Sequence, residues 1–231
     1  MFPLKDDIPA RLFPVVNIAL IVANLVAYGY LAAQGAAAGP LFVEHGFVPA
    51  RFLASADFVL SPARLLPVFS SMFLHGNILH LVGNMWMLWI FGDNVEDAMG
   101  HGRYLLFYLL CGMASVAAQT WVAPGSGVPM VGASGAISGV LGGYFCIYPR
   151  ARVLTLVPIF IFFYLVEIPA YFFLGLWFLL QFAQGGLQIL VGAAASGVAW
   201  WAHVGGFGAG VLLIRFFRKG SAARRGKKLR W

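Results

Sequence analysis

A few polar side chains stand in stretches of sequence that carry almost no charge, and these are the residues that could do chemistry. From Tyr104 to Pro149 there is no Asp, Glu, Lys or Arg, and from Val153 to Ile214 the only such residue is Glu167. Polar groups in long apolar stretches are costly to bury, so they are functional candidates by default. They are His75, His80, Asn84, Ser115, Gln119, Ser134, Ser138, Gln181, Ser196 and His203.

The segment Gly132-Ala133-Ser134-Gly135 places a serine where an apolar stretch begins, after the turn-rich Pro124–Gly127. A serine at a helix start is often an N-cap, and this motif alone leaves that interpretation open. The alternative is a nucleophile whose developing oxyanion faces backbone N–H groups and the positive end of the helix dipole. The flanking glycines would let a substrate backbone approach closely.

His203 lies in a second apolar stretch, within Ala202-His203-Val204-Gly205-Gly206. A lone histidine in a helix more often packs or hydrogen-bonds than catalyses. Small residues four apart form a ridge beside each candidate, namely Gly135, Gly139 and Gly143, and Ala202, Gly206 and Gly210. Such ridges let helix backbones approach closely in lipid. Packed together, the two helices would bring the Ser134 hydroxyl and the His203 imidazole within hydrogen-bond reach.

A third cluster runs from His75 to Asn84 and includes His80. His80 and Asn84 are four residues apart, so they share one face of a helix. Histidine pairs at this spacing bind zinc, but the partner here is an asparagine and no Cys or Asp completes the set. We therefore favour hydrogen-bond donors to an oxyanion and expect no metal. No carboxylate stands near His203 in a span, which predicts a Ser–His dyad and not a triad.

The composition predicts a membrane protein. Of the 231 residues, 61% are hydrophobic and 10% are charged, against about 25% charged in soluble domains. The net charge of +7 is concentrated in basic residues behind the last apolar stretch. That placement is typical of a cytoplasmic flank beside anionic lipid headgroups, and it disfavours nucleic-acid binding.

A membrane-spanning helix needs about 20 apolar residues. We expect an all-α polytopic bundle with six spans, at about Phe13–Ala33, Asn77–Val95, Tyr104–Val122, Ser134–Pro149, Ile168–Gln184 and Gly197–Phe217. An even number of spans and the basic C-terminus put both termini in the cytoplasm. Residues 1–12 then form a cytoplasmic N-terminus, residues 13–217 the membrane domain, and residues 218–231 a basic tail.

Two connections between the spans need separate treatment. Residues 39–75 form a long amphipathic outer loop, which we expect to lie partly in the membrane interface as short helices. Val153–Val166 is broken by a proline and rich in β-branched and aromatic residues, which favours a short hairpin over a seventh span. Glu167 is expected in the first turn of the next helix, where an acid is common. We interpret His45 and His101 as surface loop residues.

These motifs, in this order, resemble those of the rhomboid family of intramembrane serine proteases, from about Arg64 to Gly210. The matching residues are His75, His80 and Asn84; Glu96, Gly100 and Arg103 in a Glu-x-x-x-Gly-x-x-Arg signature; Gly132-Ala133-Ser134-Gly135; and His203 with Gly206 and Gly210. The resemblance implies a six-helix bundle with a water-accessible cavity and without a metal or organic cofactor.

The resemblance also implies roles for individual residues. Ser134 would be the nucleophile and His203 the general base, with His80 and Asn84 stabilising the oxyanion. The supporting positions are His75, Gly132, Gly135 and Gly206, and the structural ones are Arg64, Glu96 and Arg103. The implied substrates are single-pass transmembrane proteins cut in or near their spans. One alternative is an inactive relative that binds such proteins as a scaffold. A channel or transporter is a second alternative, which is disfavoured because the spans lack a charged relay.

Two positions differ from the family pattern. The outer-loop Trp-Arg pair is Ala63-Arg64, and the aromatic residue four positions after the nucleophile is Ser138, so the sequence does not show what orients the His203 ring. We expect a cavity over Ser134, partly covered by Ala123–Met130. We also expect a multi-pass protein of a prokaryotic plasma membrane, since no targeting peptide precedes the first span. The physiological substrate and the oligomeric state stay open.

Overall fold

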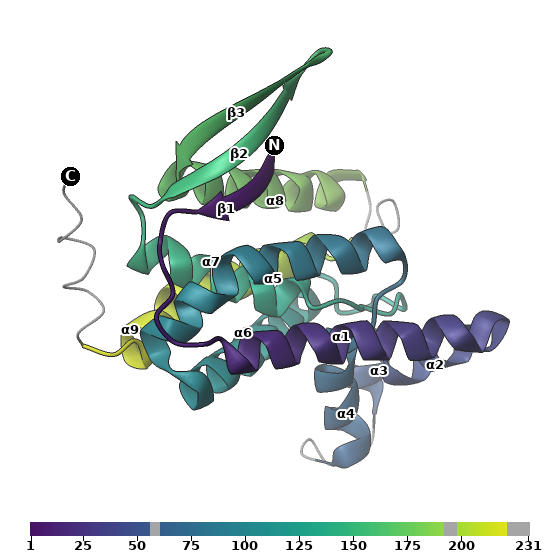
Figure 1. The fold of residues 1–231 in the computed structure, drawn as a ribbon. Coiled ribbons are helices and arrows are strands. Elements are labelled where there is room, and N and C mark those ends of the chain that lie inside the picture. The colour runs from purple at the N-terminus through teal and green to yellow at the C-terminus, as the bar shows by residue number, and fades with distance from the viewer. Residues whose placement is uncertain (56–60, 192–197, 221–231) are drawn as a thin grey trace.

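The computed structural model describes residues 1–55, 61–191 and 198–220. Six long helices form its bundle (Figure 1): α1 (Val15–Gln34), α5 (Ile78–Met99), α6 (His101–Val122), α7 (Ser134–Ile147), α8 (Ala170–Val191) and α9 (Trp200–Phe217). Each corresponds to one predicted apolar stretch, so the helical bundle is confirmed. The predicted span start at Gly197, the polar Ser196 and tail residues 221–231 lie outside the described residues.

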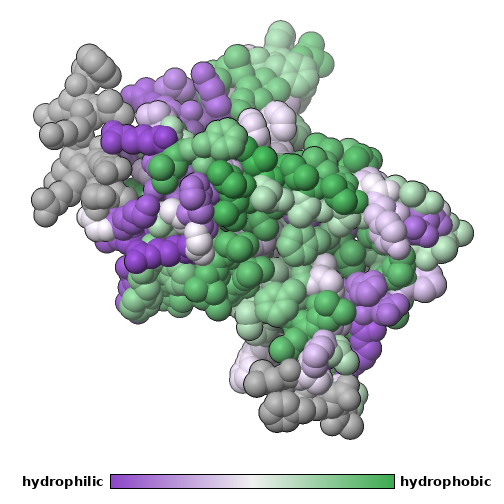
Figure 2. Space-filling view, turned by 60° about the horizontal axis from the view of Figure 1, so that its bottom comes forward, coloured by the Kyte–Doolittle hydropathy of each residue, from purple (hydrophilic) through white to green (hydrophobic). Residues whose placement is uncertain are grey.

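Membrane crossing is supported by the length and apolar composition of the helices. Within the described ranges, three helical segments are long and apolar enough to cross a membrane: Val15–His45, His101–Val122 and Ala170–Leu190. Pro62–Phe73 and Ile78–Met99 meet the same criterion only together, as a pair bent by 83°. α7 has 14 residues, about 21 Å, which is shorter than a bilayer core. Figure 2 shows apolar residues across the middle of the visible face and hydrophilic residues toward two ends. The chain is a helical membrane protein, and the count of six spans stays a prediction.

Glycines let α7 pack closely against both α6 and α9, which also pack on each other. A β-carbon added at Gly206 of α9 would collide with the carbonyl oxygen of Gly135 on α7. One added at Gly210 would collide with the carbonyl oxygen of Gly139. A β-carbon added at Gly135 would collide with the Ser115 side chain of α6. The α9 ridge therefore packs on α7 as predicted, whereas the α7 ridge faces mainly α6.

The outer loop is helical over most of its described length, in α2 (Ala38–His45), α3 (Pro49–Ala54) and α4 (Pro62–Ser70). Phe47 and Met130 exchange backbone hydrogen bonds of 3.1 and 2.7 Å, which joins this loop to the segment before Ser134. The Arg64 guanidinium lies 4.6 Å from the centre of the Phe52 ring. This cation–π contact fastens α4 to α3 although Ala63 stands in place of a tryptophan.

The predicted hairpin is confirmed, but it belongs to a larger unit. β2 (Arg152–Ile159) and β3 (Phe162–Pro169) pair antiparallel, and β1 (Phe2–Asp6) adds to β2, giving the order β1-β2-β3. The hairpin projects from the helices (Figure 1). The sequence does not predict β1, because five residues of mixed polarity show no clear alternation without their partner strand.

Glu167 does not lie in the first turn of a helix, so that prediction is wrong. It belongs to β3 and forms an ion pair of 2.8 Å with Arg152, and α8 begins at Ala170. The strand register explains the contact. Arg152 faces Pro169 across the hairpin, so Glu167 is its diagonal neighbour on the same side. Both side chains are largely exposed, so the pair contributes little to stability.

Glu96 is fully buried and caps α1. Its carboxylate accepts the backbone N–H groups of Val16 at 3.0 Å and Asn17 at 2.7 Å, at the helix end that favours negative charge. It also pairs with His101, the first residue of α6, so the prediction that His101 is a loop residue is wrong. Within the described ranges no ion pair joins Glu96 to Arg103, whose side chain is exposed.

Asp6 fastens the N-terminal segment to the bundle. Its carboxylate accepts the Tyr144 hydroxyl of α7 and, at 3.0 Å, the Asn94 amide of α5. Burial raises the pKa of Asp6 to about 6, and the hydrogen bond from Tyr144 opposes part of that rise. Nearby, the Trp86 indole of α5 donates to the Pro3 carbonyl at 2.6 Å. β1 therefore ties α5 and α7 to the sheet.

The contact between α7 and α9 predicts opposite effects for two glycines of α9. Gly206→Ala forces the two helix backbones apart and should destabilise the protein by about 1–3 kcal/mol. Gly208→Ala places its β-carbon where no atom lies within 4 Å, so it should be neutral or stabilise by about 0.5–1 kcal/mol. Thermal unfolding in detergent measures both, and equal Tm values for the two variants would contradict this packing.

The raised pKa of Asp6 predicts a pH-dependent stability. The folded state holds the Asp6 proton more tightly than the unfolded chain, so the stability that this residue contributes is full below about pH 4 and is lost as the pH rises through about 6. Asp6→Asn keeps a side-chain acceptor and cannot ionise. The Tm of this variant minus that of the wild type should therefore increase between pH 5 and pH 8. A constant difference over that range would contradict the burial of this carboxylate.

Candidate active site

Ser134 and His203 meet where α9 passes the start of α7. The Oγ atom of Ser134, the first residue of α7, lies 2.8 Å from Nε2 of His203. The two residues are 69 positions apart, so only helix packing brings them together. His203 stands about one turn before Gly206, which lies against the Gly135 carbonyl, and this register sets its ring beside Ser134. A hydroxyl and an imidazole at this distance have the geometry that a nucleophile and a general base require.

Side chains from two helices surround the His203 ring. Its Nδ1 atom lies 2.7 Å from Oε1 of Gln181 on α8. The ring centroids of Trp177 and Trp200 lie 6.2 and 6.0 Å from that of His203. Ser138 does not take the place of the missing aromatic residue, because its hydroxyl donates to the carbonyl of the first residue of α7 at 2.6 Å. The sequence motifs indicate neither tryptophan, and they mark Gln181 only as a polar residue in a span.

His80 and Asn84 lie on one face of α5, as predicted. The Asn84 amide donates one N–H to Nε2 of His75 at 2.9 Å, and an amide nitrogen carries a second N–H for a ligand. His75 is only 1% exposed, so it holds Asn84 from inside the protein. Asn77 caps α5 by accepting the His80 backbone N–H at 2.8 Å. Among the described residues, no three His, Cys, Asp or Glu side chains are grouped to hold a metal ion.

Gly132 occupies a position that suits only glycine. Its φ angle is +122°, in the region that side chains disfavour. Its N–H donates to the Ser71 carbonyl at 2.9 Å, and a β-carbon there would lie 2.7 Å from the His80 ring. Because Gly132 has no side chain, the backbone can take this conformation just before Ser134 and the His80 ring has room beside it.

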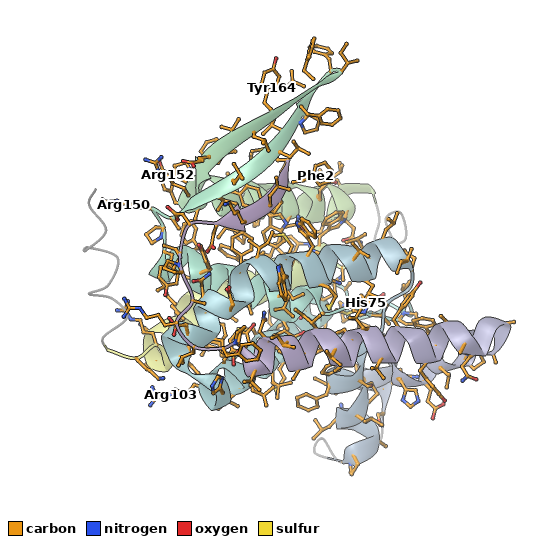
Figure 3. The ribbon with its side chains drawn as sticks, viewed as in Figure 1. Phe2, His75, Arg103, Arg150, Arg152 and Tyr164 are labelled. Carbon is orange, nitrogen blue, oxygen red and sulfur yellow. The ribbon has the colours of Figure 1, made fainter. Side chains whose placement is uncertain are left out.

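A cavity of about 820 Å³ connects these groups. The polar side chains on its wall include His80, Asn84, Ser134, Gln181 and His203. The segment Ala123–Met130 borders it as predicted, through both of its end residues. Figure 3 shows His75 at one end of the bundle and Arg103 and Arg150 toward the other. The site therefore lies away from the basic connections that were assigned to the cytoplasm.

Comparison with known proteins gives one family match and several partial relatives. A family model described as the Rhomboid domain matches residues 62–220. Presenilin-associated rhomboid-like protein A, mitochondrial, of Danio rerio is 36% identical over 120 residues, 48% of this chain and 31% of that protein. Rhomboid protein 1, mitochondrial, of Saccharomyces cerevisiae is 30% identical over 115 residues, 48% and 32% of the two chains. Rhomboid protease GluP of Bacillus subtilis is 45% identical over 69 residues, which are 30% of this chain and 13% of that protein.

The alignments cover about a third or less of each relative's own length. The domain match, in contrast, covers more than half of this chain, and every candidate residue from Arg64 to Gly206 falls inside it. The motif resemblance is thus confirmed by an independent comparison: the chain belongs to the rhomboid family.

Proposed function

We propose that this protein is an intramembrane serine endopeptidase that cleaves single-pass transmembrane proteins in or near their spans. The observation that carries the proposal is the 2.8 Å contact between Ser134 Oγ and His203 Nε2, on the wall of a cavity that also holds amide and imidazole donors. The bacterial relative named as a rhomboid protease supports it. An inactive scaffold would not need a hydroxyl and an imidazole held at this distance.

Proton transfer between these two side chains carries the reaction. His203 Nε2 takes the hydroxyl proton while Ser134 Oγ attacks the peptide carbonyl, forming a tetrahedral intermediate. The protonated imidazole then gives its proton to the departing amine, which leaves an acyl-enzyme. The same ring deprotonates a water molecule, which hydrolyses the ester and restores Ser134.

The oxyanion is stabilised by donors around the start of α7. Ser134 is the first residue of that helix, and N–H groups in a first helical turn have no partner within the helix. His80 and Asn84 add side-chain donors from α5, with His75 holding the Asn84 amide. Donors placed in advance stabilise the charge without reorganising as it develops. Gly132 gives His80 the space to lie among them.

Substrate reaches the site from within the bilayer. Met87 of α5 and Trp177 of α8 both line the cavity. Both helices also expose apolar side chains, among them Val82, Trp86, Leu179 and Leu180. A transmembrane segment that slides between α5 and α8 would therefore stay in apolar surroundings until it meets Ser134.

We further propose the plasma membrane of a prokaryote as the location of the protein, in keeping with the bacterial relative. The relatives whose names include the word mitochondrial support a mitochondrial membrane as the alternative.

A serine-reactive probe tests the dyad directly. A fluorescent fluorophosphonate should label the detergent-purified wild type, while Ser134→Ala and His203→Ala should remain unlabelled, because the hydroxyl reacts only when a base removes its proton. In-gel fluorescence measures labelling and thermal unfolding checks folding. A folded, unlabelled wild type, or equal labelling of Ser134→Ala, would reject the dyad and favour the scaffold.

The oxyanion donors predict a loss of turnover without a matching loss of binding. Asn84→Ala should lower kcat by about 10²–10³-fold, the usual cost of removing one such donor. KM for a transmembrane substrate should change little, since the missing hydrogen bond forms mainly in the transition state. Kinetics in liposomes measure both constants, with Gly208→Ala as the control expected to retain the wild-type rate. A rise in KM at unchanged kcat would place Asn84 in substrate binding instead.

A further inference from the structure

We propose that Gln181 is the positioning residue of the active site: its amide oxygen holds the proton of His203 on Nδ1 and so keeps Nε2 ready to act as a base. The proposal rests on the proposed function, because it assigns how the base of that reaction is prepared.

The two contacts of the His203 ring define the argument. Nε2 lies 2.8 Å from Ser134 Oγ and Nδ1 lies 2.7 Å from Gln181 Oε1. A neutral imidazole carries one N–H, and the nitrogen without it is the one that can accept a proton. An amide oxygen can only accept a hydrogen bond, so its contact with Nδ1 requires the N–H there. The unprotonated Nε2 then faces the serine hydroxyl, as general-base catalysis requires.

The opposite orientation of the amide would have the opposite effect. If the NH₂ group of Gln181 faced Nδ1, that nitrogen would have to accept, and Nε2 would carry the proton toward Ser134. The ring could then no longer deprotonate the hydroxyl. The orientation of one amide therefore decides whether the dyad is competent, a dependence that a residue of purely structural importance would not create.

No carboxylate takes this role among the described residues of the cavity wall, none of which is an Asp or Glu. Glu167, the only acid between Val153 and Ile214, is exposed and paired with Arg152. A neutral amide fixes the tautomer of the ring, but it lacks the negative charge with which a carboxylate stabilises the imidazolium. The site thus uses an orienting group that selects the tautomer without adding charge to an apolar region.

α8 is held so that Gln181 keeps this position. The Trp201 indole of α9 donates to the Gly185 carbonyl at 3.1 Å, one turn after Gln181. Further along, the Gln188 amide donates to the Val198 carbonyl at 3.4 Å. Trp177, Gln181, Gly185 and Gln188 recur at helical spacing, and together they form the face of α8 that meets α9 and the cavity. Movement of α8 would therefore change the orientation of His203.

Two variants of Gln181 and one matched control test the proposal. Gln181→Leu removes the acceptor and should lower kcat by roughly 10- to 100-fold, part of what general-base catalysis contributes, with KM little changed. Gln181→Glu restores an acceptor and should recover turnover, with the acidic limb of its pH–rate profile moved to higher pH, since a carboxylate favours the protonated imidazole. Gln184→Leu makes the same change at an exposed position of α8 and should leave kcat and the profile unaltered.

The readouts separate this proposal from the proposed function. Kinetics in liposomes give kcat, KM and the pH–rate profile, and ¹⁵N NMR of histidine-labelled protein reports the tautomer of His203. A labelled, active wild type whose kcat survives Gln181→Leu, or whose KM alone rises, would overturn the role of Gln181 and leave the dyad intact. A wild type that the fluorophosphonate does not label would reject the proposed function itself. Should Gln181→Leu fail to fold, an unshifted profile of Gln181→Glu would still contradict the proposal.

Discussion

Backbone contact between α7 and α9 is the constraint on which the site depends. The two helices approach until Gly206 meets the carbonyl of Gly135 and Gly210 meets that of Gly139, and no side chain fits at these crossings. His203 stands about one turn before Gly206 on α9, so its ring reaches Ser134 only at this separation of the helices. In lipid, where apolar side chains gain little from leaving their surroundings, such close packing is itself a main source of helix association.

Buried polar groups are the second constraint, because each needs a partner where water is scarce. Asn17 donates to the Leu88 carbonyl and accepts the Tyr104 hydroxyl, which joins α1 to α5 and α6. Near the cavity, the Asn84 amide donates to Nε2 of the buried His75. The partners are shared between helices, so the hydrogen bonds that offset the cost of burial also fix the relative positions of the helices.

Different hydrogen bonds stabilise the two ends of the bundle. At the end that holds the site, the outer loop pairs with Met130 and Ser71 accepts the Gly132 N–H, which shapes the chain just before Ser134. At the other end, Glu96 caps α1 and Asp6 ties β1 to α5 and α7. Helix α7 connects the two sets of contacts, because Ser134 begins it just after Gly132 and Tyr144, which donates to Asp6, lies near its end.

Periodic small residues and the absence of charge were enough to predict the helical bundle and the meeting of Ser134 with His203, and the four-residue spacing of His80 and Asn84 placed them on one helix face. A proline within a run of β-branched and aromatic residues predicted the hairpin. These signals are local, because each depends on neighbours within a few turns. The sequence could not show that Gln181 orients His203, that Glu96 caps α1, or that β1 pairs with β2, since each contact joins segments far apart in the chain. The misplacement of Glu167 has the same origin, because its partner Arg152 is set by the register of two strands. Residue types limited what chemistry was possible, and tertiary packing decided which groups came within hydrogen-bond distance.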